Sequence, residues 1–155
     1  MNARVSTAAV LSALFWASAA PSQTVQQKLD LTREAVESQR RLLVSGSLRL
    51  GDAEAKAFWP LYDDYEKERR PLDARANKLV ADFLAAAGSL TDAQARSMLD
   101  DGLKIEEARA KLRRSWYDRM AKAIPARELA RFYQIENKLD AVVRADLSKQ
   151  IPLVP

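Results

Sequence analysis

The 155-residue chain contains no cysteine, no histidine and only four glycines. Without cysteine there can be no disulfide bond and no thiol chemistry, and a chain of this size can be stabilised by its core without disulfides. Without histidine the chain lacks the commonest general base, the commonest transition-metal ligand and the side chain that titrates near neutral pH. These absences leave few ways to build a catalytic or transition-metal site.

Sequence motifs that carry known chemistry are also absent. The chain has no phosphate-binding glycine loop, no G-x-S-x-G turn and no H-E-x-x-H helix. Acidic doublets occur at 63–64, 100–101 and 106–107, but neighbouring helix positions point about 100° apart, so their carboxylates do not converge. We therefore predict that the protein is not an enzyme and has no cofactor and no catalytic or metal-binding residues. A cation held by carboxylates is the alternative.

Residues 1–19 have the organisation of a secretory signal peptide. A weakly positive start precedes the apolar run VSTAAVLSALFWA, which is too short to span a membrane, and Ala17-Ser18-Ala19 follows the small-x-small cleavage rule. We predict cleavage after Ala19 and export to the periplasm. Residues 20–155 would then form a single domain with no stable membrane insertion, and an uncleaved N-terminal anchor is the alternative.

The rest of the chain has the composition of helices. Ala, Leu, Lys, Arg and Glu dominate after residue 25, and no stretch alternates polar with β-branched residues. We predict an all-α fold of four helices, at 25–44, 52–87, 92–123 and 125–149. Pro125 suits the first turn of the last helix, whereas Pro152 and Pro155 leave 151–155 as an extended tail.

A short phrase occurs twice, as LGDAEAKAFW at 50–59 and as LTDAQARSML at 90–99. In the second copy Thr91 and Gln94 stand at the positions of a capping box, in which each side chain accepts the backbone amide of the other residue. In the first copy Glu54 keeps its position, but a glycine without a side-chain oxygen replaces the threonine. We interpret the following residues as the helix-capping motif: Leu50, Glu54, Leu90, Thr91 and Gln94.

The predicted second helix carries its apolar residues in one stripe and is interrupted by Pro60 and Pro71. The two prolines lie on nearly the same face, so their bends should add and curve the helix. Its inner face would then carry Tyr62, Tyr65 and Arg69. Two interpretations stay open: this face surrounds an ordinary core, or it forms a concave surface used for binding.

Positive charge concentrates in the segment 104–131, which holds nine cations and four acids. Within it, Arg113, Arg114 and Trp116 belong to the stretch LRRSWYDR. The segment is either a solvated helix face or a contact surface for an anionic or unfolded-protein partner. The whole chain has a formal net charge of only +4, and we predict no nucleic-acid partner.

The LTxxQ sequence at 90–94, its near copy at 50–54, the export signal and the helical pattern together resemble the Spy/CpxP-like LTxxQ superfamily of bacterial periplasmic stress proteins. The phrases AFWPLYDDYEKERRPL and RFYQIENKLDAVVRADL are closer still to a branch of small exported proteobacterial proteins. The resemblance implies a long bent antiparallel helical hairpin that pairs into a curved homodimer. It also implies an ATP-independent chaperone, or a sensory adaptor of a membrane-bound signalling partner. Some relatives bind metal through histidine, which this chain lacks.

We therefore expect a periplasmic binding protein that holds non-native polypeptide on a concave surface without ATP. Its candidate client-binding residues are Tyr62, Tyr65 and Arg69 on one wall and Arg113, Arg114 and Trp116 on the other. The alternative is a regulatory adaptor that binds one signalling partner, such as the sensor domain of a kinase or an anti-sigma factor. A structural protein without a client is the third possibility.

Overall fold

The computed structural model describes residues 25–153, and over this range it contains four helices and no strand. The helices are α1 (Val25–Ser47), α2 (Asp52–Ala86), α3 (Asp92–Met120) and α4 (Ala126–Gln150). The predicted all-α fold of four helices is thus confirmed. The predicted signal peptide at 1–19 lies outside the described residues.

All helix ends but two lie within one residue of their predicted positions. The first helix ends at Ser47, three residues later than predicted, and the third ends at Met120, three residues earlier. Pro125 is the N-cap of α4 and not part of its first turn, because its ψ of 147° is extended. Its carbonyl still accepts the first hydrogen bond of the helix, from the amide of Leu129 at 3.0 Å.

Helix α2 continues through both of its prolines. Proline has no amide proton, so each one removes a hydrogen bond from the helix interior. The helix tolerates this loss because its apolar stripe is buried by tertiary contacts, which contribute more to helix stability than intrinsic propensity does. Its curvature stays a prediction, as does dimerisation.

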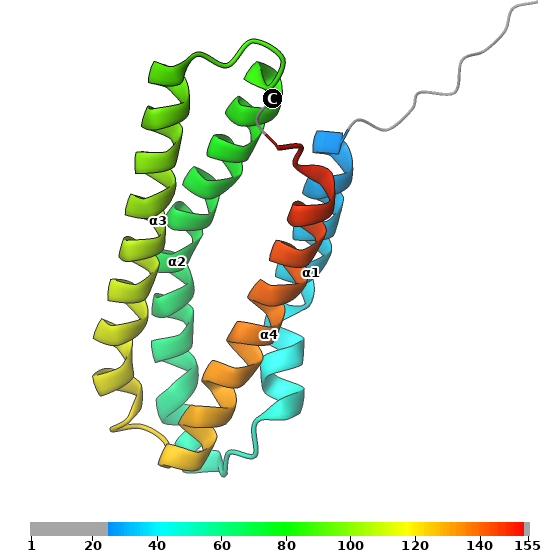
Figure 1. Ribbon diagram of the computed structural model, residues 1–155. Coiled ribbons are helices and arrows are strands. Elements are labelled where there is room, and N and C mark those ends of the chain that lie inside the picture. The colour runs from blue at the N-terminus through cyan, green and yellow to red at the C-terminus, as the bar shows by residue number, and fades with distance from the viewer. Residues whose placement is uncertain (1–24, 154–155) are drawn as a thin grey trace, which may run out of the picture.

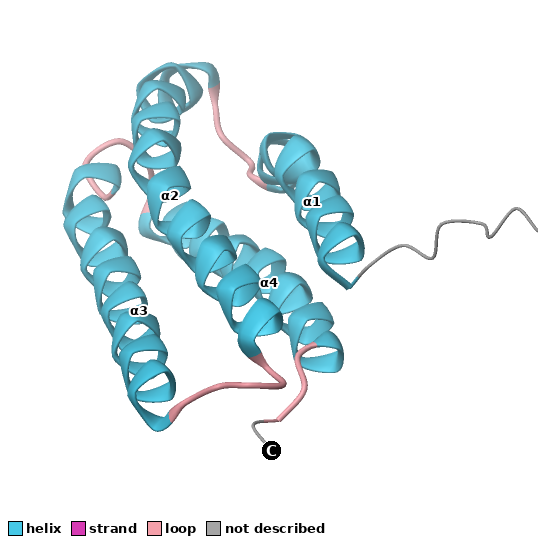
Figure 2. Cartoon of the chain, turned by 90° about the horizontal axis from the view of Figure 1, so that it is seen from above, coloured by secondary structure: helices cyan, strands magenta, loops and turns pink. Residues whose placement is uncertain are grey.

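The helices associate in two pairs, α2 with α3 and α1 with α4 (Figure 1). Seen from above, α3 and α1 lie on opposite sides of the molecule, with α2 and α4 between them (Figure 2). The loops 48–51 and 121–125 lie at one end, which we call the core end. The loop 87–91 lies at the other end, together with the start of α1 and the end of α4, and we call this the groove end.

An aromatic cluster near the core end forms the main core. The ring of Phe132 on α4 lies 5.5 Å from that of Phe58 and 5.9 Å from that of Tyr65, both on α2, in edge-on contacts. Such pairs add about 0.5–1.5 kcal/mol each to the effect of burial. Val44 of α1 and Trp116 of α3 complete the cluster, so all four helices meet here.

The capping box of α3 is confirmed. The Thr91 hydroxyl accepts the Gln94 amide at 3.3 Å, and the Gln94 side chain accepts the Thr91 amide at 3.0 Å. At the start of α2 only half of this arrangement exists, because the Glu54 carboxylate accepts the Gly51 amide at 2.9 Å and glycine offers no oxygen in return. Within the described part of the chain, no helix is both long and apolar enough to cross a membrane.

Candidate functional site

The predicted aromatic wall on α2 is not accessible. Tyr62, Tyr65 and Arg69 are buried, and so is Trp116 on α3. The two tyrosines pack against Phe132 of α4, Arg69 joins a buried ion pair with Glu66, and Trp116 packs against Tyr65. The expectation of an open surface built from these four residues is therefore wrong for this structure, and the ordinary-core interpretation holds for this face of α2.

The two predicted arginines of α3 have different surroundings. Arg113 is half-buried and forms an ion pair with Asp140 on α4. Its backbone carbonyl also accepts a hydrogen bond from the Tyr133 hydroxyl at 2.7 Å. Arg114 is exposed, and its guanidinium carbon lies 5.3 Å from the centre of the Tyr117 ring. Arg113 is therefore already paired with an acid, whereas Arg114 forms no ion pair with any described residue.

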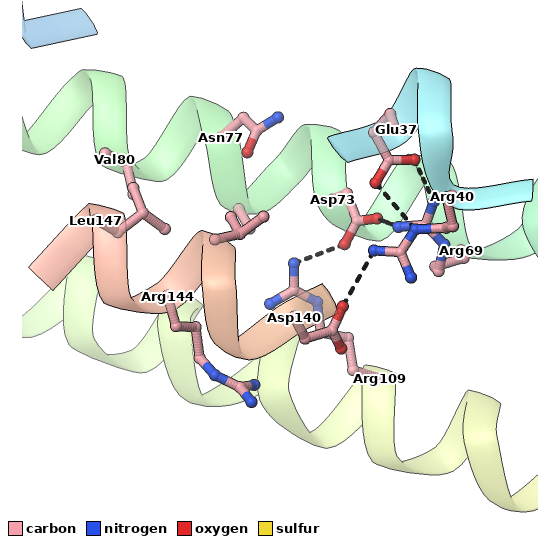
Figure 3. Close-up of a pocket in the computed structure, with 12 residues that line it drawn as sticks. Glu37, Arg40, Arg69, Asp73, Asn77, Val80, Arg109, Asp140, Arg144 and Leu147 are labelled. Atoms are coloured by element: carbon pink, nitrogen blue, oxygen red, sulfur yellow. Dashed lines mark hydrogen bonds and ion pairs between the residues drawn. The ribbon is translucent and has the colours of Figure 1, made fainter. Parts of the chain in front are cut away.

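A set of buried and half-buried ion pairs, which we call the ion cluster, lies between the helices (Figure 3). Arg40 of α1 donates to Glu136 at 2.8 Å and to Asp140 at 3.2 Å, both on α4. Arg69 of α2 binds Glu37 of α1. The complete cluster consists of Glu37, Arg40, Glu66, Arg69, Asp73, Arg109, Arg113, Glu136 and Asp140.

Three contacts of the ion cluster join one helix pair to the other. They are Arg69 to Glu37, Arg113 to Asp140, and the Tyr65 hydroxyl to Glu136 at 3.3 Å. Buried ion pairs recover little net stability, because desolvation offsets their attraction, but they can specify one arrangement of the elements that they join. We infer that the cluster fixes how the two helix pairs face each other.

Glu136 is the most deeply buried acid of the ion cluster. Burial raises the pKa of its carboxyl, against the opposing effect of Arg40 and Arg69. Its Oε2 accepts from Arg40 and Tyr65, whereas Oε1 is buried with no hydrogen-bond partner among the described residues. All cations of the cluster are guanidinium groups, which stay charged and act only as hydrogen-bond donors. No group of three or more acidic side chains within residues 25–153 is placed to hold a metal ion.

A narrow cavity of about 100 Å³ separates α2 from α4 beside the ion cluster. Figure 3 shows Val80 of α2 and Leu147 of α4 at the opposite end of this cavity from the ion pairs. Ala76 and Val143 also line it. The space between the two inner helices therefore changes from ionic to apolar towards the groove end.

An apolar groove of about 300 Å³ continues from Val80 towards the groove end. Every side chain that lines it is apolar: Leu79, Val80, Phe83, Leu90, Ala95, Met98, Leu99 and Ile151. Leu90 and Ala95 flank the capping box, so the repeated LTxxQ phrase also builds one end of this groove. The corresponding Leu50 of the first copy packs against the core instead.

A second depression, of about 510 Å³, lies between α3 and α4. We call it the basic depression, because its lining contains two arginines and no acid. The lining residues are Arg113, Arg114, Tyr117, Ala126, Leu129, Ala130, Tyr133 and Asn137. It places Arg113 and Arg114 of the predicted basic segment in one depression.

The sequence partly indicated both the apolar groove and the basic depression. Leu99 and Tyr117 lie off the stripe of α3 that contains Ile105, Trp116 and Met120, and both are exposed. Large apolar residues outside a buried stripe indicate a possible contact surface. Periodicity could not show that Leu99 and Ile151 line the same groove, because this depends on how α4 returns along the other helices.

Comparisons with protein-family models, with curated proteins and with solved structures find no match to this chain. The resemblance to the LTxxQ superfamily stays a prediction.

Proposed function

We propose that the protein holds non-native polypeptide in its apolar groove, as an ATP-independent chaperone of the bacterial periplasm. The observation that supports this is the lining of the groove, which is entirely apolar in a chain with 30% charged residues. Leu99 exposes 66% of its surface there. Exposed apolar patches on otherwise polar proteins commonly mark contact surfaces.

The size of the groove suits weak and reversible binding. Its volume of about 300 Å³ is at the lower limit of typical ligand sites, so it can take one or two apolar side chains of a client. Burying one such side chain contributes about 1.5–3 kcal/mol. A contact of this strength forms and breaks without a nucleotide cycle and without any catalytic group.

Uniform apolar lining also suits unselective binding. The groove presents no side-chain hydrogen-bond donor or acceptor, so nothing in it discriminates one apolar client segment from another. A chaperone for many unfolded proteins needs this property. The second candidate function, a regulatory adaptor for one signalling partner, is favoured by the basic depression, where charge could select the partner.

The test is an aggregation assay with two unrelated, chemically unfolded client proteins and no ATP. We expect the protein to suppress aggregation of both clients near stoichiometric ratios. Leu99→Asp should abolish most of the suppression, because it places a charge in the groove at a position whose exposure allows the protein to fold.

The matched control is Leu42→Asp on α1. Leu42 exposes 71% of its surface and does not line the groove, so this variant should keep full activity. A folded protein that protects neither client, or a Leu99→Asp variant as active as the parent, would show that the groove is not a client site.

A further inference from the structure

The basic depression has an excess of positive charge that the protein itself does not neutralise. Lys104, Arg109, Arg113 and Arg131 each form an ion pair with an acid. The other five cations of segment 104–131 form no ion pair with an acid within the described part of the chain: Lys111, Arg114, Arg119, Lys122 and Arg127. Arg114 lines the depression, and Arg127 follows its lining residue Ala126.

In another surface depression of this protein, acidic side chains balance most of the positive charge. This depression, between α1 and α2, is lined by four cations and three acids, and in it Arg41 forms an ion pair with Asp63. The basic depression has cations and no acid in its lining. Unlike the depression between α1 and α2, it therefore presents a field that attracts a negatively charged group.

The floor of the basic depression is apolar and aromatic. Leu129 is buried at the floor of the depression, and the small side chains of Ala126 and Ala130 leave space next to it. Tyr117 exposes 43% of its surface. The rings of Tyr117 and Tyr133 lie 6.5 Å apart between their centres. A volume of about 510 Å³ accommodates a few side chains of a peptide.

The walls of the basic depression are held in place before any partner arrives. The Tyr133 hydroxyl donates to the Arg113 carbonyl at 2.7 Å, and burial raises the pKa of this hydroxyl, so it stays a donor. Asp140 holds the Arg113 guanidinium, which keeps further N–H groups for a ligand. A preformed site loses less conformational entropy on binding.

The geometry points to a second binding site, in which the basic depression takes an acidic segment of a partner protein. An aliphatic or aromatic side chain of the segment lies against Tyr117 and Tyr133, and flanking carboxylates meet Arg114 and Arg113. The site shares no lining residue with the apolar groove, so this inference goes beyond the proposed chaperone function and does not depend on it.

A peptide fits this site better than a nucleic acid does. Binding of single-stranded nucleic acid usually combines a continuous basic track with several stacking rings. Here the cations surround one depression, and the rings in its lining are those of two tyrosines. A charged depression with an apolar floor matches an acidic peptide that carries one anchoring side chain.

The test measures fluorescence anisotropy of a labelled short peptide in which a central Phe is flanked on both sides by Asp and Glu. We expect saturable binding to the purified protein that weakens with added salt. Arg114→Glu should weaken it by about tenfold or more, because an attractive charge-assisted contact becomes a repulsive one. Replacing the Phe of the peptide by Ser should also weaken binding by about tenfold.

Arg96→Glu is the matched control, since Arg96 is exposed on the same helix, has no acidic partner among the described residues and undergoes the same change of charge. It should change the affinity by less than about twofold. Leu99→Asp should also leave peptide binding intact, which separates this site from the apolar groove. Equal binding by Arg114→Glu, no effect of the Phe-to-Ser change, or tighter Arg114-dependent binding of a thymidine oligonucleotide would each overturn the inference.

Discussion

The two ends of the molecule are built differently although the same helices run between them. At the core end, side chains from all four helices fill one aromatic cluster, and Phe58, Trp116 and Phe132 are fully buried. At the groove end, apolar side chains of α2, α3 and the residue after α4 line a groove that stays accessible. Apolar residues therefore serve stability at one end and remain available for contacts at the other.

The ion cluster lies between these two regions. An ion pair joins α2 to α1, and a tyrosine hydroxyl of α2 donates to a carboxylate of α4, partway along the helices. Because a fully apolar interface would bury the groove as well, we infer that the cluster limits the packed core to one end. Three predictions test this division, in order of decreasing expected effect.

The first comparison is between two phenylalanines. Phe132→Ala at the core end should lower the free energy of unfolding by about 3–5 kcal/mol, because it removes a fully buried ring. Phe83→Ala in the groove should cost about half as much or less, since Phe83 is only partly buried. Urea denaturation followed by circular dichroism measures both, and equal costs would contradict a division into a packed end and an accessible end.

Substitutions of two adjacent arginines compare the stability cost of losing a buried ion pair with that of losing an exposed one. Arg40 and its partner Glu136 each expose 2% of the side chain, whereas Arg41 exposes 52% in its pair with Asp63. Arg40→Met should cost about 3–5 kcal/mol, because it leaves a carboxylate buried without its partner. Arg41→Met should cost at most about 1 kcal/mol.

A second substitution tests why Arg40→Met destabilises the protein. Adding Glu136→Gln to Arg40→Met should restore part of the lost stability, because the second change removes the unpaired buried charge. Chemical denaturation of the two single variants and the double variant forms a double-mutant cycle. If the double variant is less stable than Arg40→Met alone, the cost of Arg40→Met does not come from the stranded carboxylate.

The smallest expected effects distinguish the two copies of the repeated phrase. Thr91→Ala should destabilise the protein by about 1 kcal/mol, because it removes the confirmed side-chain cap of α3. Gly51→Thr should stabilise it by a few tenths of a kcal/mol. The φ of Gly51 is −71°, and an added Cβ would meet only the Glu54 carboxylate, at 3.9 Å. Denaturant midpoints would measure both changes, and a destabilising Gly51→Thr would contradict the capping interpretation of the first copy.

Much of the fold followed from local patterns. The composition and periodicity predicted four helices, and Thr91 with Gln94 predicted the start of α3 correctly, because a capping box depends only on residues three apart. The ends of α1 and α3 were less predictable. At those ends hydrogen bonds into the next turn, such as Leu48 to Val44 at 3.0 Å, decide where the helix stops.

The candidate sites were predicted less well. Tyr62, Tyr65 and Trp116 were expected on a binding wall, but Phe132 of α4 packs against the two tyrosines and Trp116 is buried against Tyr65. Arg113 and Arg114 are adjacent and chemically identical in the sequence, yet only Arg113 meets Asp140. One sequence pattern describes both a core stripe and a binding stripe, because both place apolar residues on one face.

The sequence by itself determined the helical class, the capping box and the excess of positive charge in the segment 104–131, because propensity, capping and local charge are properties of nearby residues. Tertiary structure alone decided which apolar stripes are buried, which arginines are paired and where an accessible groove remains. These outcomes depend on the approach of α4 to α1, α2 and α3, and residues as distant in the chain as Arg40 and Glu136 are brought together only by packing.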